Sequence, residues 1–144
     1  MSSKTARLNE LIEVTRDGER FYRHAAEQVR EPSLQVLFGE MAEVKSQVIQ
    51  ALAMQVAAHQ EQPAQGGTLS GALREVYADT RANFSRDQAA TYVAQLDLAE
   101  ERILQTFEDA LQDADSEMLA VLNAELPRLR ASHARMHELK RSMQ

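Results

Sequence analysis

The chain has no cysteine and no tryptophan, and it has only 5 glycines and 3 prolines among its 144 residues. The absence of cysteine excludes disulfides, thiolate zinc sites and cysteine nucleophiles, and it favours a reducing compartment such as the cytoplasm. Scarce glycine and proline are unusual in sheet proteins with many tight turns and are typical of long helices. We therefore expect an all-α, cytoplasmic protein.

Long apolar runs and a surplus of positive charge are also missing. No run of about 18 apolar residues occurs, and the first residues lead into a charged helix, so we expect neither a membrane span nor an export signal. The net charge is −6, whereas nucleic-acid binding requires a surplus of Lys and Arg on one face. A length of 144 residues is typical of one domain. We expect a single domain, residues 1–144, that binds neither nucleic acid nor membrane.

The main positive signal is a repeat of apolar residues at alternating spacings of three and four. This repeat predicts helices over about residues 5–30, 33–60, 69–84, 87–111 and 115–142. The first two long helices are joined by a very short connection, so they should be antiparallel. Residues 61–84, which include the short helix, are long enough to return along the bundle. The sequence thus predicts a ferritin-like antiparallel four-helix bundle with an extra short helix in the crossover.

One proline lies inside the last predicted helix. Pro127 cannot donate a backbone hydrogen bond to Asn123, so we expect a kink or bulge there. The apolar stripe continues in register beyond it, so we expect no domain boundary.

Three polar residues occupy positions on the helical stripes that should be apolar: Glu19, Glu100 and His133. A carboxylate in a helical core requires a hydrogen-bonded partner, a cation or a proton, because an isolated buried charge is very costly. Counting from the turns places the three at similar depth in the bundle. We therefore expect them to meet in the interior.

The di-metal sites of ferritin-like bundles provide a template for such a cluster. They take one Glu from each of two helices and a Glu-x-x-His from each of the other two. Glu19 and Glu100 fit the single-Glu positions. The second helix offers only Val44-Lys45-Ser46-Gln47, and the last offers Arg130-Ala131-Ser132-His133. Arg130 thus replaces a carboxylate by a guanidinium, which can neutralise acids without a metal.

This comparison predicts a metal-free buried cluster of Glu19, Glu100, Arg130 and His133 that needs no cofactor. Two alternatives stay open. A degenerate site for iron or another divalent metal could use Glu19, Glu43, Glu100 and His133, provided that the second helix is rotated. Otherwise the stripe assignment is off, and these side chains reach solvent.

The remaining histidines give weaker signals. His133 and His137 are four residues apart and could share a metal, but the Glu of a His-Glu-x-x-His motif is missing. We interpret them as one inward and one surface histidine. No Gly-rich phosphate loop or Ser-His-Asp set occurs, so no catalytic residue is predicted, and a non-enzymatic protein is favoured over an enzyme.

Several segments resemble the bacterial DUF2383 family of four-helix-bundle proteins: Leu11–Tyr22, Ala42–Gln47, Ala99–Leu111 and Arg130–His133. The resemblance implies a ferritin-like bundle of unassigned biochemical function that is linked to bacterial stress responses. It also implies that the Asp17-Gly18-Glu19 turn and the Arg-x-x-His of the last helix are family features. The chain departs from the family at Val44, where many relatives have a second acid, and this argues against metal binding.

Three functions follow from these patterns. The first is a non-enzymatic, stress-related bundle whose buried cluster specifies its packing. The second is a ferritin-like protein that carries or oxidises iron. The third is a helical module that binds another protein, or a second copy of itself, through residues 69–84 or a face of the bundle.

Overall fold

The computed structural model describes residues 2–144, which form five α-helices and no β-strand. The helices are α1 (Ser3–Gln28), α2 (Pro32–Ala58), α3 (Leu69–Asn83), α4 (Gln88–Leu111) and α5 (Ser116–Ser142). Each helix end lies within two residues of its predicted position, and the predicted all-α fold is confirmed. Within residues 2–144, no helix combines the length and apolar character that crossing a bilayer requires.

Local sequence signals determine where the helices begin. The N-caps of α1, α3, α4 and α5 are Ser2, Thr68, Asp87 and Asp115, each of which accepts a hydrogen bond from the backbone N–H three residues later. α2 instead begins at Pro32, where the missing N–H costs nothing. Because these signals act over one turn, they could be identified without tertiary information.

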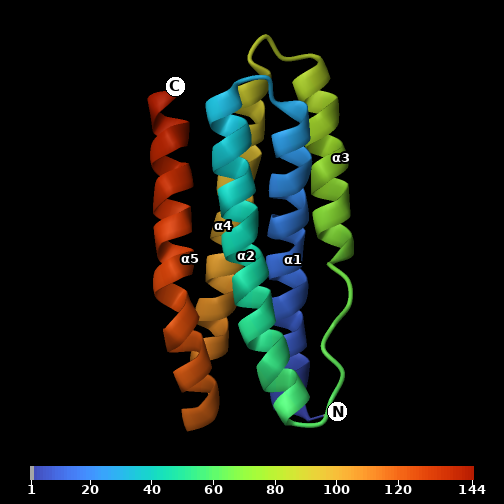
Figure 1. Cartoon of the computed structure of the whole chain (residues 1–144), viewed down its shortest axis with the longest axis vertical. Coiled ribbons are helices and arrows are strands. Elements are labelled where there is room, and N and C mark those ends of the chain that lie inside the picture. Colours follow the sequence, from blue (N-terminus) through green and yellow to red (C-terminus); the bar gives the residue numbers. More distant parts are fainter. Residues whose placement is uncertain (1) are drawn as a thin grey trace.

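Four helices, α1, α2, α4 and α5, pack as a bundle, and α3 lies outside it along α1 and α4 (Figure 1). The most extensive packing joins α1 to α2 and α4 to α5. Seen with the N-terminus at the bottom, α1, α3 and α5 rise while α2 and α4 descend. α2 and α4 therefore run in the same direction, and residues 59–68 together with α3 make the return. Assignment to the ferritin-like class stays a prediction.

The core consists of two apolar clusters separated by a polar layer. One cluster includes Leu11, Val48, Ile103 and Leu122, and the other includes Phe21, Phe38, Tyr92 and Met136. Between them, each of the four bundle helices contributes a buried polar residue: Thr15, Lys45, Glu100 and Ser132. We call this polar layer the waist of the bundle. Buried polar residues also occur elsewhere in the described chain, at Thr5, Asn9, Asp97 and Glu125.

The Asp17-Gly18-Glu19 turn of α1 has a clear packing role. A Cβ on Gly18 would lie 2.6 Å from Cδ1 of Ile103, so glycine lets α1 approach α4 closely. The Asp17 carboxylate accepts a hydrogen bond from the Thr68 N–H at 2.8 Å and occupies the space that a Cβ on Gly71 would need. Asp17 thus anchors the first turn of α3 to α1.

α5 continues as one helix through Pro127, which is exposed. The Asn123 carbonyl receives no N–H from Pro127, but Asn123 is exposed and solvent can satisfy it.

Replacing Pro127 should therefore stabilise the protein. We expect Pro127→Ala to raise the free energy of unfolding by about 1–3 kcal/mol, because it restores one helical hydrogen bond and removes the ring clash. Urea unfolding followed by circular dichroism would measure the change. Pro32→Ala is the matched control, since Pro32 occupies a position where proline is tolerated, and it should give no comparable gain. An equal gain in both variants would contradict the explanation.

Candidate functional site

Glu100 of α4 is buried in the polar layer and is held by two other helices. Lys45 of α2 places its Nζ 2.8 Å from Oε1 of Glu100, and the hydroxyl of Tyr22 on α1 donates to Oε2 at 2.9 Å. The Lys45 ammonium also lies 5.4 Å from the centre of the Tyr22 ring, which adds a cation–π contact. All three side chains are buried, so this ion pair is desolvated, but neither charge lacks a partner.

Burial changes the acidity of the groups around Glu100. It lowers the pKa of Lys45, while the charge of Glu100 and its hydrogen bond act in the opposite direction. Burial also raises the pKa of Tyr22 well above its usual value, and the nearby charge of Glu100 adds to the effect. Tyr22 therefore remains a hydrogen-bond donor at neutral pH.

The structure corrects the expected partner of Glu100. Arg130 is exposed and does not compensate this carboxylate, and Lys45 compensates it instead. The expectation failed because Val44 was assigned to the interior of the second helix, and one residue changes the facing direction by about 100°. A signal was present, since Lys45 lies four residues after Met41 and three before Val48, both of which are buried.

The alternative metal ligands are also separated in the structure. Arg23 lies between Glu19, at 3.2 Å, and Glu43, at 3.9 Å, and Glu43 is exposed. Among residues 2–144, neither carboxylate belongs to a group of potential ligands with Glu100 or His133. The prediction that Glu19, Glu100 and His133 meet in the interior was therefore wrong, because the three side chains face different neighbours.

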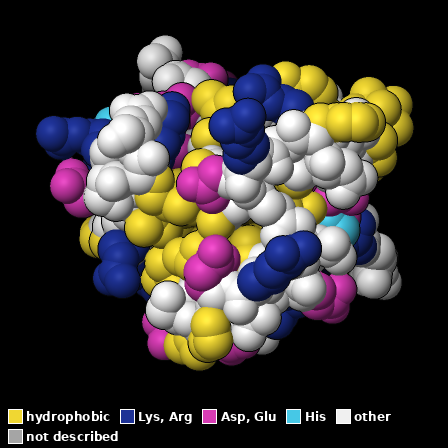
Figure 2. All heavy atoms as spheres, turned by 90° about the horizontal axis from the view of Figure 1, so that it is seen from above, with side chains coloured by type: hydrophobic (Ala, Val, Ile, Leu, Met, Phe, Trp, Pro, Cys, Tyr) yellow, Lys and Arg dark blue, Asp and Glu magenta, His cyan; other side chains and the backbone are white. Residues whose placement is uncertain are grey.

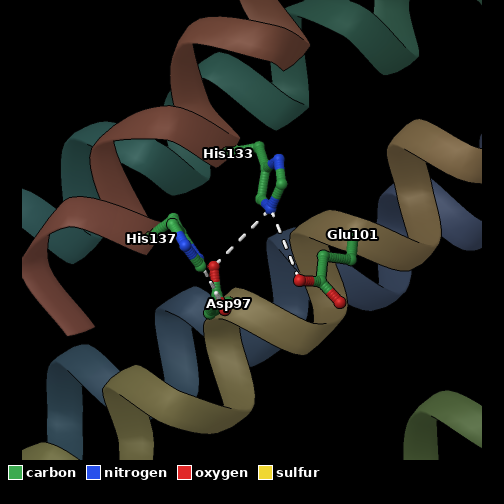
Figure 3. Close-up of side chains that lie close together, drawn as sticks. All are labelled: Asp97, Glu101, His133 and His137. Carbon is green, nitrogen blue, oxygen red and sulfur yellow. Dashed lines mark hydrogen bonds and ion pairs between the residues drawn. The ribbon is translucent and has the colours of Figure 1, made fainter. Parts of the chain in front are cut away.

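His133 belongs to a different cluster, where α4 faces α5 (Figure 3). Asp97 and Glu101 lie one turn apart on α4, and His133 and His137 lie one turn apart on α5. Nε2 of His133 is 3.7 Å from a carboxylate oxygen of each acid, and Nδ1 of His137 is 3.3 Å from Oδ2 of Asp97. One potential ligand atom from each of the four residues lies within 4.8 Å of the others.

Asp97 is the buried member of this cluster, with a side chain that is 1% exposed. Among the described residues, its Oδ1 has no hydrogen-bond partner, and neither has Nε2 of His133. Lys140 places its Nζ 3.6 Å from Oδ2 of Asp97, which is too long for a hydrogen bond. Several cationic or polar groups therefore surround this carboxylate, but one of its oxygens is unsatisfied, which is costly in a buried site.

The spacing of the four side chains is compatible with a metal ion. Ligands bound tetrahedrally at 2.0–2.1 Å are about 3.3–3.4 Å apart. Three nitrogen–oxygen pairs of the cluster are 3.3–3.7 Å apart, and the four potential ligand atoms all lie within 4.8 Å of one another. The side chains of Glu101 and His137 are both 49% exposed, so an ion could reach the cluster from solvent.

Sequence reasoning missed the two acids of this cluster. Asp97 and Glu101 are four residues apart, and so are His133 and His137. Two pairs with this spacing lie on single faces of their helices, and antiparallel neighbours can bring such faces together. This signal was present but required pairing two segments that are far apart in the sequence.

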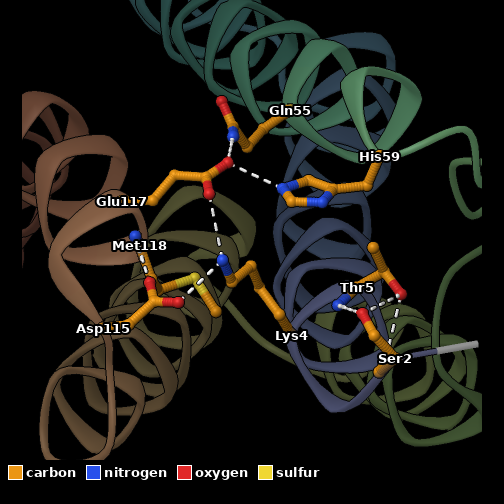
Figure 4. Close-up of polar contacts among 8 residues, drawn as sticks. All are labelled: Ser2, Lys4, Thr5, Gln55, His59, Asp115, Glu117 and Met118. Carbon is orange, nitrogen blue, oxygen red and sulfur yellow. Dashed lines mark hydrogen bonds and ion pairs between the residues drawn. The ribbon is translucent and has the colours of Figure 1, made fainter.

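A third polar network joins the start of α1, the end of α2 and the start of α5 (Figure 4). Lys4 contacts Asp115 at 2.7 Å and Glu117 at 3.0 Å, while His59 and Gln55 both contact Glu117. Hydrogen bonds from Lys4 are the largest cause that lowers the pKa of Asp115 and of Glu117. Both carboxylates already have close partners, so this network is best explained as a structural connection.

Comparison with known proteins identifies the family. Residues 4–113 match the family described as a domain of unknown function, DUF2383. The protein belongs to the DUF2383 family. The resemblance inferred from sequence is thereby confirmed, whereas no curated protein and no solved structure matches the chain. The matched range includes Asp97 and Glu101 and ends before α5, so it does not extend to His133 and His137.

Removing the positive charge from the waist of this DUF2383 protein should strongly destabilise it. We expect Lys45→Met to lower the free energy of unfolding by about 3–5 kcal/mol, because it leaves Glu100 buried without a counter-charge. Urea unfolding would measure the loss.

The double variant Lys45→Met/Glu100→Gln provides the matched control. It removes both charges and keeps an acceptor for Tyr22, so it should recover most of the loss. A double variant as unstable as the sum of its two single variants would show that the pair is not coupled.

Proposed function

We propose that this DUF2383 protein binds one divalent transition-metal ion, with Asp97, Glu101, His133 and His137 as its ligands. The observation that carries the proposal is the unsatisfied, buried Oδ1 of Asp97, which lies 3.7 Å from the unsatisfied Nε2 of His133. This separation is too long for a hydrogen bond. A cation between the two atoms would satisfy both.

The donor set determines which ions fit. Imidazole nitrogens are suited to zinc, iron, copper and nickel, whereas magnesium and calcium prefer sites made of oxygen atoms. Two imidazoles and two carboxylates, without a thiolate, are well matched to Zn²⁺ or Fe²⁺. Zn²⁺ is the first ion to test, because it is commonly held by four nitrogen and oxygen ligands.

Lys140 explains how the buried carboxylate is tolerated without a metal. Its Nζ lies 3.6 Å from Oδ2 of Asp97, and its side chain is 31% exposed. An ammonium on a flexible stem can supply positive charge to Asp97 and can move into solvent when a divalent ion takes that role. Lys140 and the metal would therefore compete for Asp97.

The proposed role is binding of a metal without catalysis, in a ferritin-like bundle in the cytoplasm. The absence of cysteine supports the compartment, and the family resemblance supports the bundle class and a link to stress. The polar layer around Glu100 has a different role in this proposal. Because Lys45 already compensates Glu100 at 2.8 Å, that layer needs no metal and maintains the packing.

Titration with Zn²⁺ tests the proposal. Isothermal titration calorimetry of metal-stripped protein at neutral pH should give about one ion per chain, with matching thermal stabilisation from preferential binding to the folded state. Binding should weaken as the pH falls, because protons compete for the two imidazoles. His133→Gln and His137→Gln should each weaken binding by about 10-fold or more, since each removes one ligand.

His59→Gln is the matched control, because His59 contacts Glu117 at the other end of the bundle and belongs to no group of potential ligands. This variant should bind Zn²⁺ like the wild type, and titration with anaerobic Fe²⁺ would then compare the two ions. Absence of binding, or equal losses in the His59 and His133 variants, would end the proposal.

A further inference from the structure

The outward face of α3 is apolar, whereas the face that packs on the bundle is made of small residues. Ala78 and Ala82 are the buried residues of α3. Five large apolar residues are each 50–89% exposed. They are four residues of α3 and its C-cap: Leu69, Leu73, Val76, Tyr77 and Phe84. This row, named here the α3 stripe, lies at the edge of the molecule, where hydrophobic side chains gather in Figure 2. Exposing these side chains to water does not stabilise a monomer. Continuous exposed apolar patches mark interaction sites.

Polar contacts on the opposite face prevent α3 from rotating to bury this stripe. The carboxylate of Asp79 lies 2.6 Å from Nε2 of His24 on α1 and accepts a hydrogen bond from the Tyr92 hydroxyl on α4 at 2.6 Å. At the other end of the helix, Asp17 accepts a hydrogen bond from the Thr68 N–H. Rotating α3 would break all three contacts, so the exposure of the stripe is built into the fold.

The spacing of the stripe fits another helix of the same kind. Leu69, Leu73, Val76 and Thr80 follow one another at spacings of four, three and four, which is the repeat of a helix seam that packs against an equivalent seam. A second copy of this chain carries the same repeat. Leu98 of α4, which is 43% exposed, lines the same shallow surface depression as Leu73 and Tyr77 and so continues the stripe.

The charges beside the stripe indicate how two copies would be oriented. At about 100° per residue, Arg74 and Arg81 lie on one side of the stripe. Glu75 and Asp79 lie on the other side; both also contact His24 of α1, and their side chains are 33% and 40% exposed. In a parallel pair of helices related by a two-fold axis, the basic side of each helix faces the acidic side of its partner. In an antiparallel pair, like sides would face each other and repel.

We propose that the α3 stripe is a dimer interface, in which two copies of the chain pack their α3 helices in parallel about a two-fold axis. The exposed apolar row supplies the buried surface, and the oppositely charged sides set the direction. The proposal does not rest on metal binding, and the cluster on α4 and α5 is not part of the interface.

Sedimentation equilibrium tests the association. The wild-type chain should dimerise with a Kd on the order of micromolar, with or without a chelator. Leu73→Glu should raise the Kd by about 100-fold or more, because the two-fold axis places the new charge in the interface twice. Met54→Glu is the matched control, since Met54 is a 74% exposed apolar residue on α2, outside the stripe, and it should leave the Kd unchanged. A wild type that stays monomeric would overturn the proposal and would leave the stripe for a different partner.

Cross-linking tests the direction, and the chain has no native cysteine to interfere. Leu69 and Thr80 both lie on the seam and are about 16 Å apart along the helix, whereas a disulfide requires Cα atoms within about 7 Å. Under mild oxidation by diamide, Leu69→Cys and Thr80→Cys should each form homodimers in a parallel pair, and Met54→Cys should not. Cross-links that form only when the first two variants are mixed would show an antiparallel pair and overturn the proposed orientation.

Discussion

Two carboxylates, Asp97 and Glu100, are buried three residues apart on α4, and the need to compensate both charges shapes the rest of the bundle. Glu100 lies deep between α1 and α2, and the chain satisfies it completely with Lys45 and Tyr22. Asp97 faces α5 near the surface, and the surrounding histidines and Lys140 approach without saturating it. A desolvated charge with all its partners maintains packing. A buried carboxylate that has one unsatisfied oxygen and lies beside exposed potential ligands is suited to bind an ion.

The same distinction separates the polar networks at the ends of the bundle from the cluster between α4 and α5. Lys4, His59 and their two acidic partners make close contacts and connect three chain segments. The contacts of Asp79 and Asp17 likewise determine how α3 is placed. Among the described residues, no carboxylate oxygen of these networks is buried without a hydrogen-bond partner, so their role is to position helices. The orientation of α3 is a consequence of such positioning, and it leaves large apolar side chains in solvent.

The Asp17-Gly18-Glu19 turn of α1 has a structural role in the bundle. Within the Asp17-Gly18-Glu19 turn, Gly18 permits the close approach of α1 to Ile103, and Asp17 holds the start of α3. Glu19 makes a surface pair with Arg23 and takes no part in the core. The turn therefore helps to assemble the bundle, and the prediction that Glu19 belongs to a buried cluster with Glu100 was wrong.

The sequence by itself determined the helices, because spacing, capping residues and prolines act within one or two turns. It also indicated that charges would be buried on the helix that carries Glu100. Only the tertiary structure decided which residues compensate them. A helix rotated by one residue turns its side chains by about 100°, and this rotation exchanges Val44 for Lys45 at the interior. The pairing of Asp97 with His133 and the outward stripe of α3 likewise depend on register and rotation, which are set by packing between segments far apart in the chain.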